Sequence, residues 1–183
     1  MKLLINEWND YMTQAERDGW IQYAAAVPMK NSLGETIYLS GQNHYIRSAM
    51  VGLRPQLNQN AIAPTIQNLS IIGTPPVCTI VGATGIMSIA FSNGDSWATE
   101  VGGGMIVYAG TPVNAGVKYY SGPWLYATAI KGLVIPPVSP ATIDLNTIGL
   151  QLATGSVVPL AYRTRRADNR TTEIATLGFV TCS

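Results

Sequence analysis

The sequence predicts an α+β protein in which a mainly β, antiparallel sandwich follows a small helical region. The first 60 residues carry 10 of the 21 charged residues (11 basic and 10 acidic) and both helix-start signals. After about residue 65, short apolar runs are separated by turn residues, a spacing typical of antiparallel sandwiches and barrels. We therefore place a helical docking region at residues 1–60 and the sandwich at residues 61–183.

Charged residues are scarce along the chain. They make up 11% of it and the formal net charge is +1, whereas ordinary soluble domains contain roughly 25%. Such a chain exerts no long-range attraction on nucleic acid or on an anionic membrane, and weakly charged surfaces tend to associate. We expect assembly with other protein chains and no nucleic-acid or membrane partner.

Membrane-targeting segments are not expected either. The opening apolar run ends at Asn6, so it is shorter than the roughly 7–15 residues of a secretory signal. No window approaches the roughly 18 apolar residues that a transmembrane helix needs.

The first helix-start signal lies near the amino terminus. Thr13 and Glu16 have the spacing of a capping box, in which the hydroxyl and the carboxylate each accept a backbone N–H. Good helix formers follow until Pro28, and a short helix from Leu4 precedes the cap. Residues 3–26 are therefore expected to be helical in two pieces.

A second cap, Ser40, predicts a helix over residues 40–53. The stretch "LGETIYLS" before it alternates enough to form a short strand over residues 33–40. Gly19, inside the preceding helix, costs about 1 kcal/mol relative to alanine, which suggests that another backbone approaches it closely.

The rest of the chain contains strand signals. Residues 56–68 are polar and without periodicity, and we interpret them as a linker. Turn signals such as "SNGDS", "AGTPVNAG", "VIPPVSP" and "ADNR" then divide the apolar runs. Strands are expected at residues 65–72, 75–82, 85–92, 103–110, 118–130, 157–167 and 171–180.

Residues 152–173, "LATGSVVPLAYRTRRADNRTTE", carry the most specific fold signal. A glycine bend leads into a strand with apolar positions, and the turn Asp168–Arg170 leads into a final strand. This stretch resembles the closing hairpin of a fibronectin type III or related immunoglobulin-like domain. The resemblance implies an immunoglobulin-like antiparallel sandwich in which Tyr162 ties back a corner through its hydroxyl.

The amino-terminal stretch resembles the helical leader of uncharacterised proteins encoded among phage and prophage structural genes. That leader has the pattern W-x₂-[LM]-T-x-A-x-R-x₂-W, followed by a helix with [LT][ST]G-Q-x₂-[FY]-[IV]-R. The resemblance implies a place in a phage particle and carries no activity. The matching residues are Trp8, Met12, Thr13, Ala15, Arg17 and Trp20, then Ser40, Gly41, Gln42, Tyr45, Ile46 and Arg47.

Residues that could perform chemistry are few. The single histidine, His44, has no nucleophile elbow to serve, so no serine triad is indicated. Cys78 and Cys182 lack metal-ligand spacing and basic neighbours, and they form either a disulfide between neighbouring strands or two buried thiols. We expect no catalytic residue, no metal and no cofactor.

Two weaker signals remain. Asp95 and Glu100 flank Trp97, which would suit a carbohydrate site with two facing carboxylates, although turn geometry alone also explains the acidic residues. The basic cluster at residues 163–170 could contact phosphate, but a solvated edge hairpin is the preferred interpretation because arginines there discourage strand pairing.

Aromatic residues are the main candidates for an interface. Those of the helices form either the core of a small hairpin or a docking surface, and 60 residues bury little area unaided. Those near residue 120 occupy both faces of the expected strand, so some of them face outward. The interface candidates are Trp8, Tyr11, Trp20, Tyr23, Tyr45, Arg47, Tyr119, Tyr120 and Trp124.

The sequence thus predicts a non-enzymatic structural subunit of a phage particle, a capsid decoration or other minor virion protein, located in the virion. Its partners would be copies of itself or other virion proteins, with no small-molecule substrate. One alternative is a surface carbohydrate- or receptor-binding module with Trp97 and Trp124 in an aromatic platform. Another is an unfamiliar enzyme that uses Asp95, Glu100 or His44.

Overall fold

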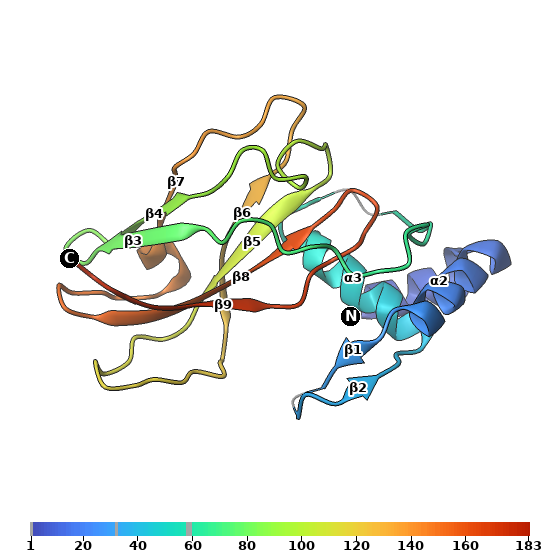
Figure 1. The fold of residues 1–183 in the computed structure, drawn as a ribbon, viewed down its shortest axis with the longest axis horizontal. Coiled ribbons are helices and arrows are strands. Elements are labelled where there is room, and N and C mark those ends of the chain that lie inside the picture. The colour runs from blue at the N-terminus through green and yellow to red at the C-terminus, as the bar shows by residue number, and fades with distance from the viewer. Residues whose placement is uncertain (1, 32, 58–59) are drawn as a thin grey trace.

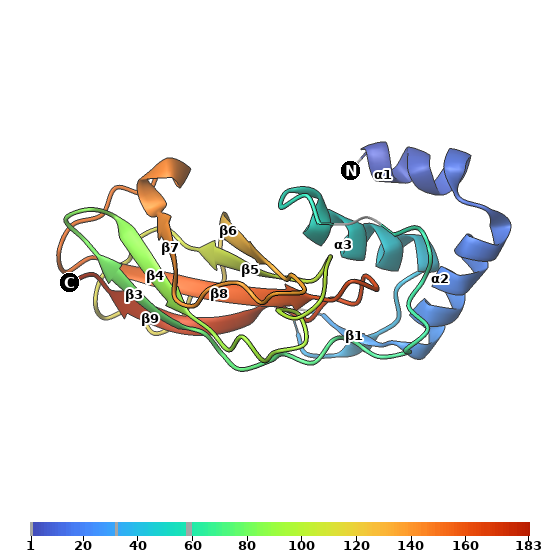
Figure 2. The same cartoon turned by 90° about the horizontal axis from the view of Figure 1, so that it is seen from above.

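A computed structural model describes residues 2–31, 33–57 and 60–183. These residues form three α-helices and three antiparallel sheets, so the fold is α+β as predicted. The helices gather at one end of the molecule, and the two larger sheets form the remainder (Figures 1 and 2).

The amino-terminal helices follow the predicted cap. Helix α1 (Lys2–Asn6) continues as a π-helical turn, Glu7–Tyr11, and α2 (Gln14–Ala26) begins after Thr13. The capping box is confirmed, because the Thr13 hydroxyl accepts from the Glu16 amide while the Glu16 carboxylate accepts from the Thr13 amide at 2.7 Å.

Helix α3 (Gly41–Leu53) also begins where its cap predicts, with the Ser40 hydroxyl accepting from the Asn43 amide. The short strands β1 (Met29–Lys30) and β2 (Thr36–Ile37) pair between α2 and α3. A β-carbon at Gly19 would lie 3.3 Å from the Ala63 β-carbon, so a small side chain approaches this glycine and not the backbone that was predicted.

Two sheets enclose the larger core. One has the order β3-β4-β7 and the other β6-β5-β8-β9, with every pair within them antiparallel. Inward side chains such as Ile80, Met87, Val107 and Leu160 are fully buried between them. The strands are β3 (Val77–Val81), β4 (Ile86–Ala90), β5 (Gly104–Ala109), β6 (Leu125–Lys131), β7 (Ala141–Asp144), β8 (Val157–Arg165) and β9 (Ala175–Thr181).

Two expected strands differ from the structure, and one observed strand was not expected. Residues 65–72 form no strand, because Leu69 instead packs against the helical core and the Asn68 carbonyl accepts from Tyr23. The strand expected over 118–130 begins only at Leu125, since Pro123 lacks the N–H that a ladder needs. Strand β7 was not predicted, because it lies in a short stretch behind a proline-rich turn.

The helical region packs on the sheet of β5. Val51 of α3 and Leu57 form a small buried cluster with Ile106 of β5. The Arg47 guanidinium donates to the Thr171 hydroxyl at 2.6 Å and to the Thr172 carbonyl at 3.0 Å. Contacts therefore cross the predicted boundary at residue 60.

The two cysteines are free thiols. The chain end lies along β3, where the Ser183 amide donates to the Ile80 carbonyl and the Gly82 amide donates to the Ser183 carbonyl. Burial raises the pKa of the Cys78 thiol to about 11 and raises that of Cys182 as well. Of the two sequence interpretations, packed thiols describe the structure.

Candidate interaction surface

The aromatic rings of the helices form the core of the helical region itself. Trp20, Tyr23 and Tyr45 are each at most 2% exposed. Ring centroids of Trp20 lie 5.7 Å from Tyr23 and 5.5 Å from Tyr45, and the indole N–H donates to the Ala61 carbonyl at 2.7 Å. This corrects the expectation that another subunit covers these three rings, because their own chain does so.

The remaining candidates of the helices differ from one another. Trp8 is half-buried and lies 5.9 Å from the Tyr45 ring. Arg47 is bonded within its own chain, and burial, with repulsion from Arg163, lowers its pKa to about 10. Tyr11 is 81% exposed. Of these three residues, only Tyr11 presents a free surface.

The basic cluster is not a solvated edge. Strand β8 lies inside its sheet, and Arg165 is fully buried, with a guanidinium that donates to the Asn169 side chain. Arg166 forms an ion pair with Glu100, and Arg170 pairs with Asp168. The structure therefore corrects the edge-hairpin interpretation, since these arginines are engaged within the chain.

The residues considered for chemistry lie in different surroundings. His44 is fully buried against Tyr23, and its Nε2 lies 3.3 Å from the Val27 carbonyl. Asp95 accepts from the Thr74 amide at 2.9 Å, in the loop after β4. Trp97 is only 2% exposed, so it cannot belong to a surface platform.

Tyr162 does not form the predicted corner. Its hydroxyl is buried and has no hydrogen-bond partner among the residues that the structure describes. The ring instead fills the core between the two sheets.

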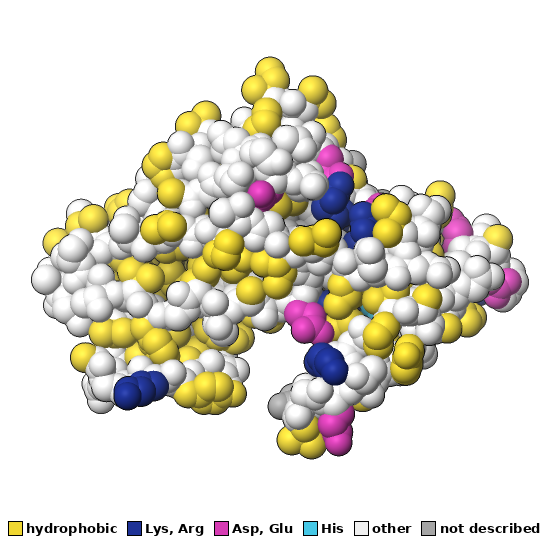
Figure 3. All heavy atoms as spheres, in the orientation of Figure 1, with side chains coloured by type: hydrophobic (Ala, Val, Ile, Leu, Met, Phe, Trp, Pro, Cys, Tyr) yellow, Lys and Arg dark blue, Asp and Glu magenta, His cyan; other side chains and the backbone are white. Residues whose placement is uncertain are grey.

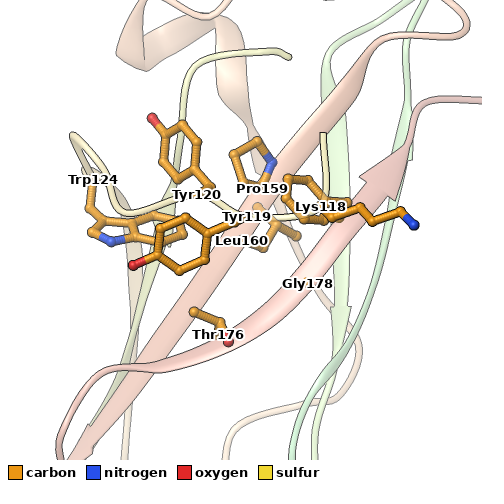
Figure 4. A pocket seen from close by; sticks show the side chains of 9 residues that line it. Lys118, Tyr119, Tyr120, Trp124, Pro159, Leu160, Thr176 and Gly178 are labelled. Atoms are coloured by element: carbon orange, nitrogen blue, oxygen red, sulfur yellow. The ribbon is translucent and has the colours of Figure 1, made fainter. Parts of the chain in front are cut away.

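The candidates near residue 120 form a pocket of about 160 Å³ beside the outer strands. The loop before β6 contributes three rings, β8 contributes Pro159 and Leu160, and β9 contributes Thr176, Gly178 and Phe179. Figure 4 shows Tyr119, Tyr120 and Trp124 gathered on one side and the Lys118 side chain extending away from these three rings. We call this site the aromatic pocket, and its rings are Tyr119, Tyr120, Trp124 and Phe179.

Tyr120 is a fixed wall of the aromatic pocket. Its hydroxyl accepts from the Thr111 amide at 3.1 Å and donates to the Pro123 carbonyl at 2.8 Å. Its ring packs edge-on against Trp124, with centroids 4.9 Å apart. A β-carbon at Gly110 would lie 2.4 Å from this ring, so glycine there lets the tyrosine seat against the backbone.

Tyr119 is the free wall of the same pocket. The residue is 81% exposed, whereas Tyr120 and Trp124 are half-buried. An incoming group would therefore meet two rings held in place and a third at the rim. The pocket is preorganised on one side, which lowers the entropic cost of binding.

The most exposed apolar segment was not predicted as a site. It connects β6 to β7, and we call residues 133–138, "LVIPPV", the apolar loop. Val134, Ile135 and Val138 are 80–82% exposed. The sequence predicts a turn at "VIPPVSP", although its run of large apolar residues without a charge is typical of an exposed apolar patch.

The apolar loop is anchored at both ends. The Gly132 amide donates to the Gly103 carbonyl at 2.9 Å, and the Leu133 amide donates to the Ala98 carbonyl at 3.1 Å. At the other end the Ser139 hydroxyl accepts from the Phe91 amide at 2.9 Å. The exposed tip therefore stands on a fixed base, and each of its large side chains forgoes roughly 1.5–3 kcal/mol by staying in water.

Charge and apolar surface separate across the molecule. In Figure 3 most charged side chains on the visible face gather over the helices and their junction with the sheets, and hydrophobic side chains form the projection at the top. That projection is the region of the apolar loop in Figure 1. No charged residue occurs between Lys131 and Asp144.

Metal clusters and membrane-spanning helices are both absent from the described residues. No group of three or more His, Cys, Asp or Glu side chains could hold a metal ion among them. Within the same residues, no helix has the length and apolar character needed to cross a membrane. Comparison of the chain with known protein families, curated proteins and solved structures found no match.

Proposed function

We propose that this protein is a non-enzymatic structural subunit that acts through protein–protein assembly contacts. The observation that carries the proposal is the apolar loop, which leaves Val134, Ile135 and Val138 at least 80% exposed on a fixed base. Contiguous exposed apolar side chains of this kind mark interaction surfaces. The low charge of the chain favours association for the same reason.

We also propose that the β part is an immunoglobulin-like sandwich, which suits a rigid assembly module. Sandwiches of that type pair strands A, B and E in one sheet and C, F and G in the other. Labelling β3, β4 and β7 as A, B and E, and β5, β8 and β9 as C, F and G, reproduces both orders with β6 as an added strand. The Tyr162 hydroxyl, which has no hydrogen-bond partner within the described part of the chain, departs from the pattern.

A phage particle is the proposed setting, in the role of a capsid decoration or other minor virion protein. The phage setting is supported by the resemblance of the amino-terminal stretch to the helical leader described above. Two residues of that resemblance, Trp20 and Tyr45, form part of the helical core in this structure. The helices would then hold the shape of the subunit, and exposed residues elsewhere would make the contacts. In a particle, many modest contacts of this kind act together.

A second candidate function, binding of a surface carbohydrate, keeps one supporting observation. Tyr119 and Trp124 line the aromatic pocket, where a sugar ring could stack. Trp97 cannot contribute because it is buried, and the hydroxyl of Tyr120 already has two partners within the chain. We therefore rank this function second.

The assembly proposal is tested by the size of the purified full-length chain. Sedimentation velocity over a range of concentrations is expected to show discrete species larger than the 19.6 kDa monomer, reversible on dilution. A chain that remains a monomer at the highest concentration contradicts the proposal.

A further inference from the structure

We propose that the apolar loop of one copy docks in the aromatic pocket of the next, so that copies join head to tail. This inference rests on the proposed function, assembly through protein–protein contacts, and names the two surfaces that meet. The loop presents exposed apolar side chains, and the pocket is lined mainly by aromatic and apolar side chains.

The geometry of β6 excludes docking within one chain. The aromatic pocket lies at the start of this strand and the apolar loop follows its end (Figure 1). The seven residues of β6 hold the two sites roughly 20 Å apart, at about 3.3 Å per residue. Because the loop is anchored by Gly132, Leu133 and Ser139, it cannot swing back, and its partner must be another molecule.

The chemistry of the aromatic pocket favours an apolar occupant. The Tyr120 hydroxyl is occupied internally, and the Lys118 ammonium points away from the rings (Figure 4). A cavity of about 150 Å³ lined by apolar groups holds a benzene molecule, so 160 Å³ accommodates one side chain such as that of Ile135 or a proline ring.

The apolar loop matches such a pocket. Pro136 and Pro137 restrict its backbone, and proline-rich segments are bound by aromatic-lined grooves in many recognition domains. Lys118 is the only charged residue between Gly110 and Trp124, so the contact would bury no carboxylate. A preformed loop meeting a preformed wall loses little conformational freedom on binding.

The symmetry of such a contact follows directly. Because the loop and the pocket are different surfaces, the interface is heterologous, and repeated docking generates a ring if the rotation closes or a filament if it does not. Either product would suit a subunit that repeats in a particle.

The test uses two single variants and their mixture, measured by sedimentation velocity. Ile135→Asp places a charge on the loop, and Tyr119→Asp places one at the pocket rim. Each substitution is at a residue at least 81% exposed, so both variants are expected to fold. Each alone is expected to self-associate at least tenfold more weakly than the wild-type chain. Mixed together, they should form a one-to-one dimer and nothing larger, because one intact loop and one intact pocket remain.

Matched controls place charges on exposed residues elsewhere. Ile71→Asp and Tyr38→Asp, at residues 84% and 63% exposed, should assemble as the wild-type chain does. If the wild-type chain assembles and either site variant assembles equally well, the docking inference is wrong while the proposed function stands. If the two site variants stay monomeric when they are mixed, the contact joins the same surface on both copies. That result would also overturn the docking inference.

A sugar ligand gives a separate result. Titration of the wild-type chain with maltoheptaose or chitotetraose should leave the tryptophan fluorescence and the assembly unchanged. Saturable binding that Tyr119→Asp abolishes would assign the pocket to carbohydrate and overturn the docking inference.

Discussion

His44 shows how a single side chain can tie the stability of the fold to pH. Its Nε2 faces the Val27 carbonyl, while its Nδ1 is buried and has no hydrogen-bond partner among the described residues. Burial lowers the pKa of this imidazole below its usual 6.5, despite the opposing hydrogen bond to Val27. The folded state therefore holds the neutral ring, and protonation favours unfolding.

We expect stability to be complete above about pH 6.5, the usual pKa of an exposed histidine, to fall as the pH decreases from there to the lowered pKa of His44 in the folded state, and to level off below it. No other histidine is present, so the loss between pH 7.5 and 5.5 belongs mainly to this residue. Urea unfolding at the two pH values measures it. His44→Gln, which keeps a donor for Val27, should be nearly independent of pH across this range; an equal loss in that variant would contradict the assignment.

The aromatic residues of the helices act on stability rather than on assembly. Trp20 is fully buried, so Trp20→Ala is expected to lower the free energy of unfolding by about 3–5 kcal/mol. Tyr11, which is 81% exposed, serves as the comparison. Tyr11→Ala should change the free energy of unfolding by less than about 0.5 kcal/mol. Denaturant titration checks both, and a Trp20 variant of wild-type stability would refute the core assignment.

At the scale of elements, the crossing of α2 and α3 depends on one glycine. A β-carbon at Gly41 would lie 2.8 Å from the Ile21 amide nitrogen and 2.9 Å from its α-carbon. Backbone atoms cannot move aside as a side-chain end can, so Gly41→Ala forces the helices apart.

We expect Gly41→Ala to destabilise the protein by about 1–3 kcal/mol, although alanine is the better helix former. The midpoint of urea unfolding measures the change. Gly116→Ala is the control, since a β-carbon there meets nothing within 4 Å. A Gly41 variant that gains stability would show that propensity outweighs the contact.

At the scale of the whole molecule, the helical region and the sheets are one packed unit. The cluster of Val51, Leu57 and Ile106 joins α3 to β5. The Arg47 guanidinium also donates a hydrogen bond to Thr171, in the segment that leads into β9. Ala61 and Ala63, in the segment between α3 and β3, pack into the helical core. The helices are therefore part of the same body rather than a separate arm.

We expect helices and sheets to open together. Amide hydrogen exchange should give the same opening free energy for peptides from α3 and from β8, since cooperative units share buried contacts. Val51→Ala, in the shared cluster, should lower both values equally. Helical amides that exchange much faster than those of β8 would contradict this and favour an independent helical region.

The sequence predicts correctly the helix starts and most strands, which depend on residues close together in the chain. Thr13 and Ser40 begin helices because a side-chain oxygen meets an amide three residues on. Most strands also follow from alternation along the chain. The strand expected at residues 65–72 is absent, however, because Leu69 finds its burial against helices instead of in a sheet.

The candidate surface was predicted only in part. Exposed aromatic residues near residue 120 follow from a crowded "KYYSGPWLY", and three of them line the pocket. The apolar loop was overlooked because prolines and turn spacing hide whether Val134 and Ile135 are covered. Trp20 and Tyr45 were candidates for an interface because a sequence does not say which chain buries a ring.

The sequence by itself determined the class of this protein, its helix starts, most of its strands and its low charge, because those depend on short-range hydrogen bonding, alternation and composition. Only the tertiary structure decided which apolar groups are satisfied within the chain and which stay in water. That distinction depends on contacts between distant segments, such as Trp20 with Ala61 and Ala98 with Leu133, which no local pattern specifies.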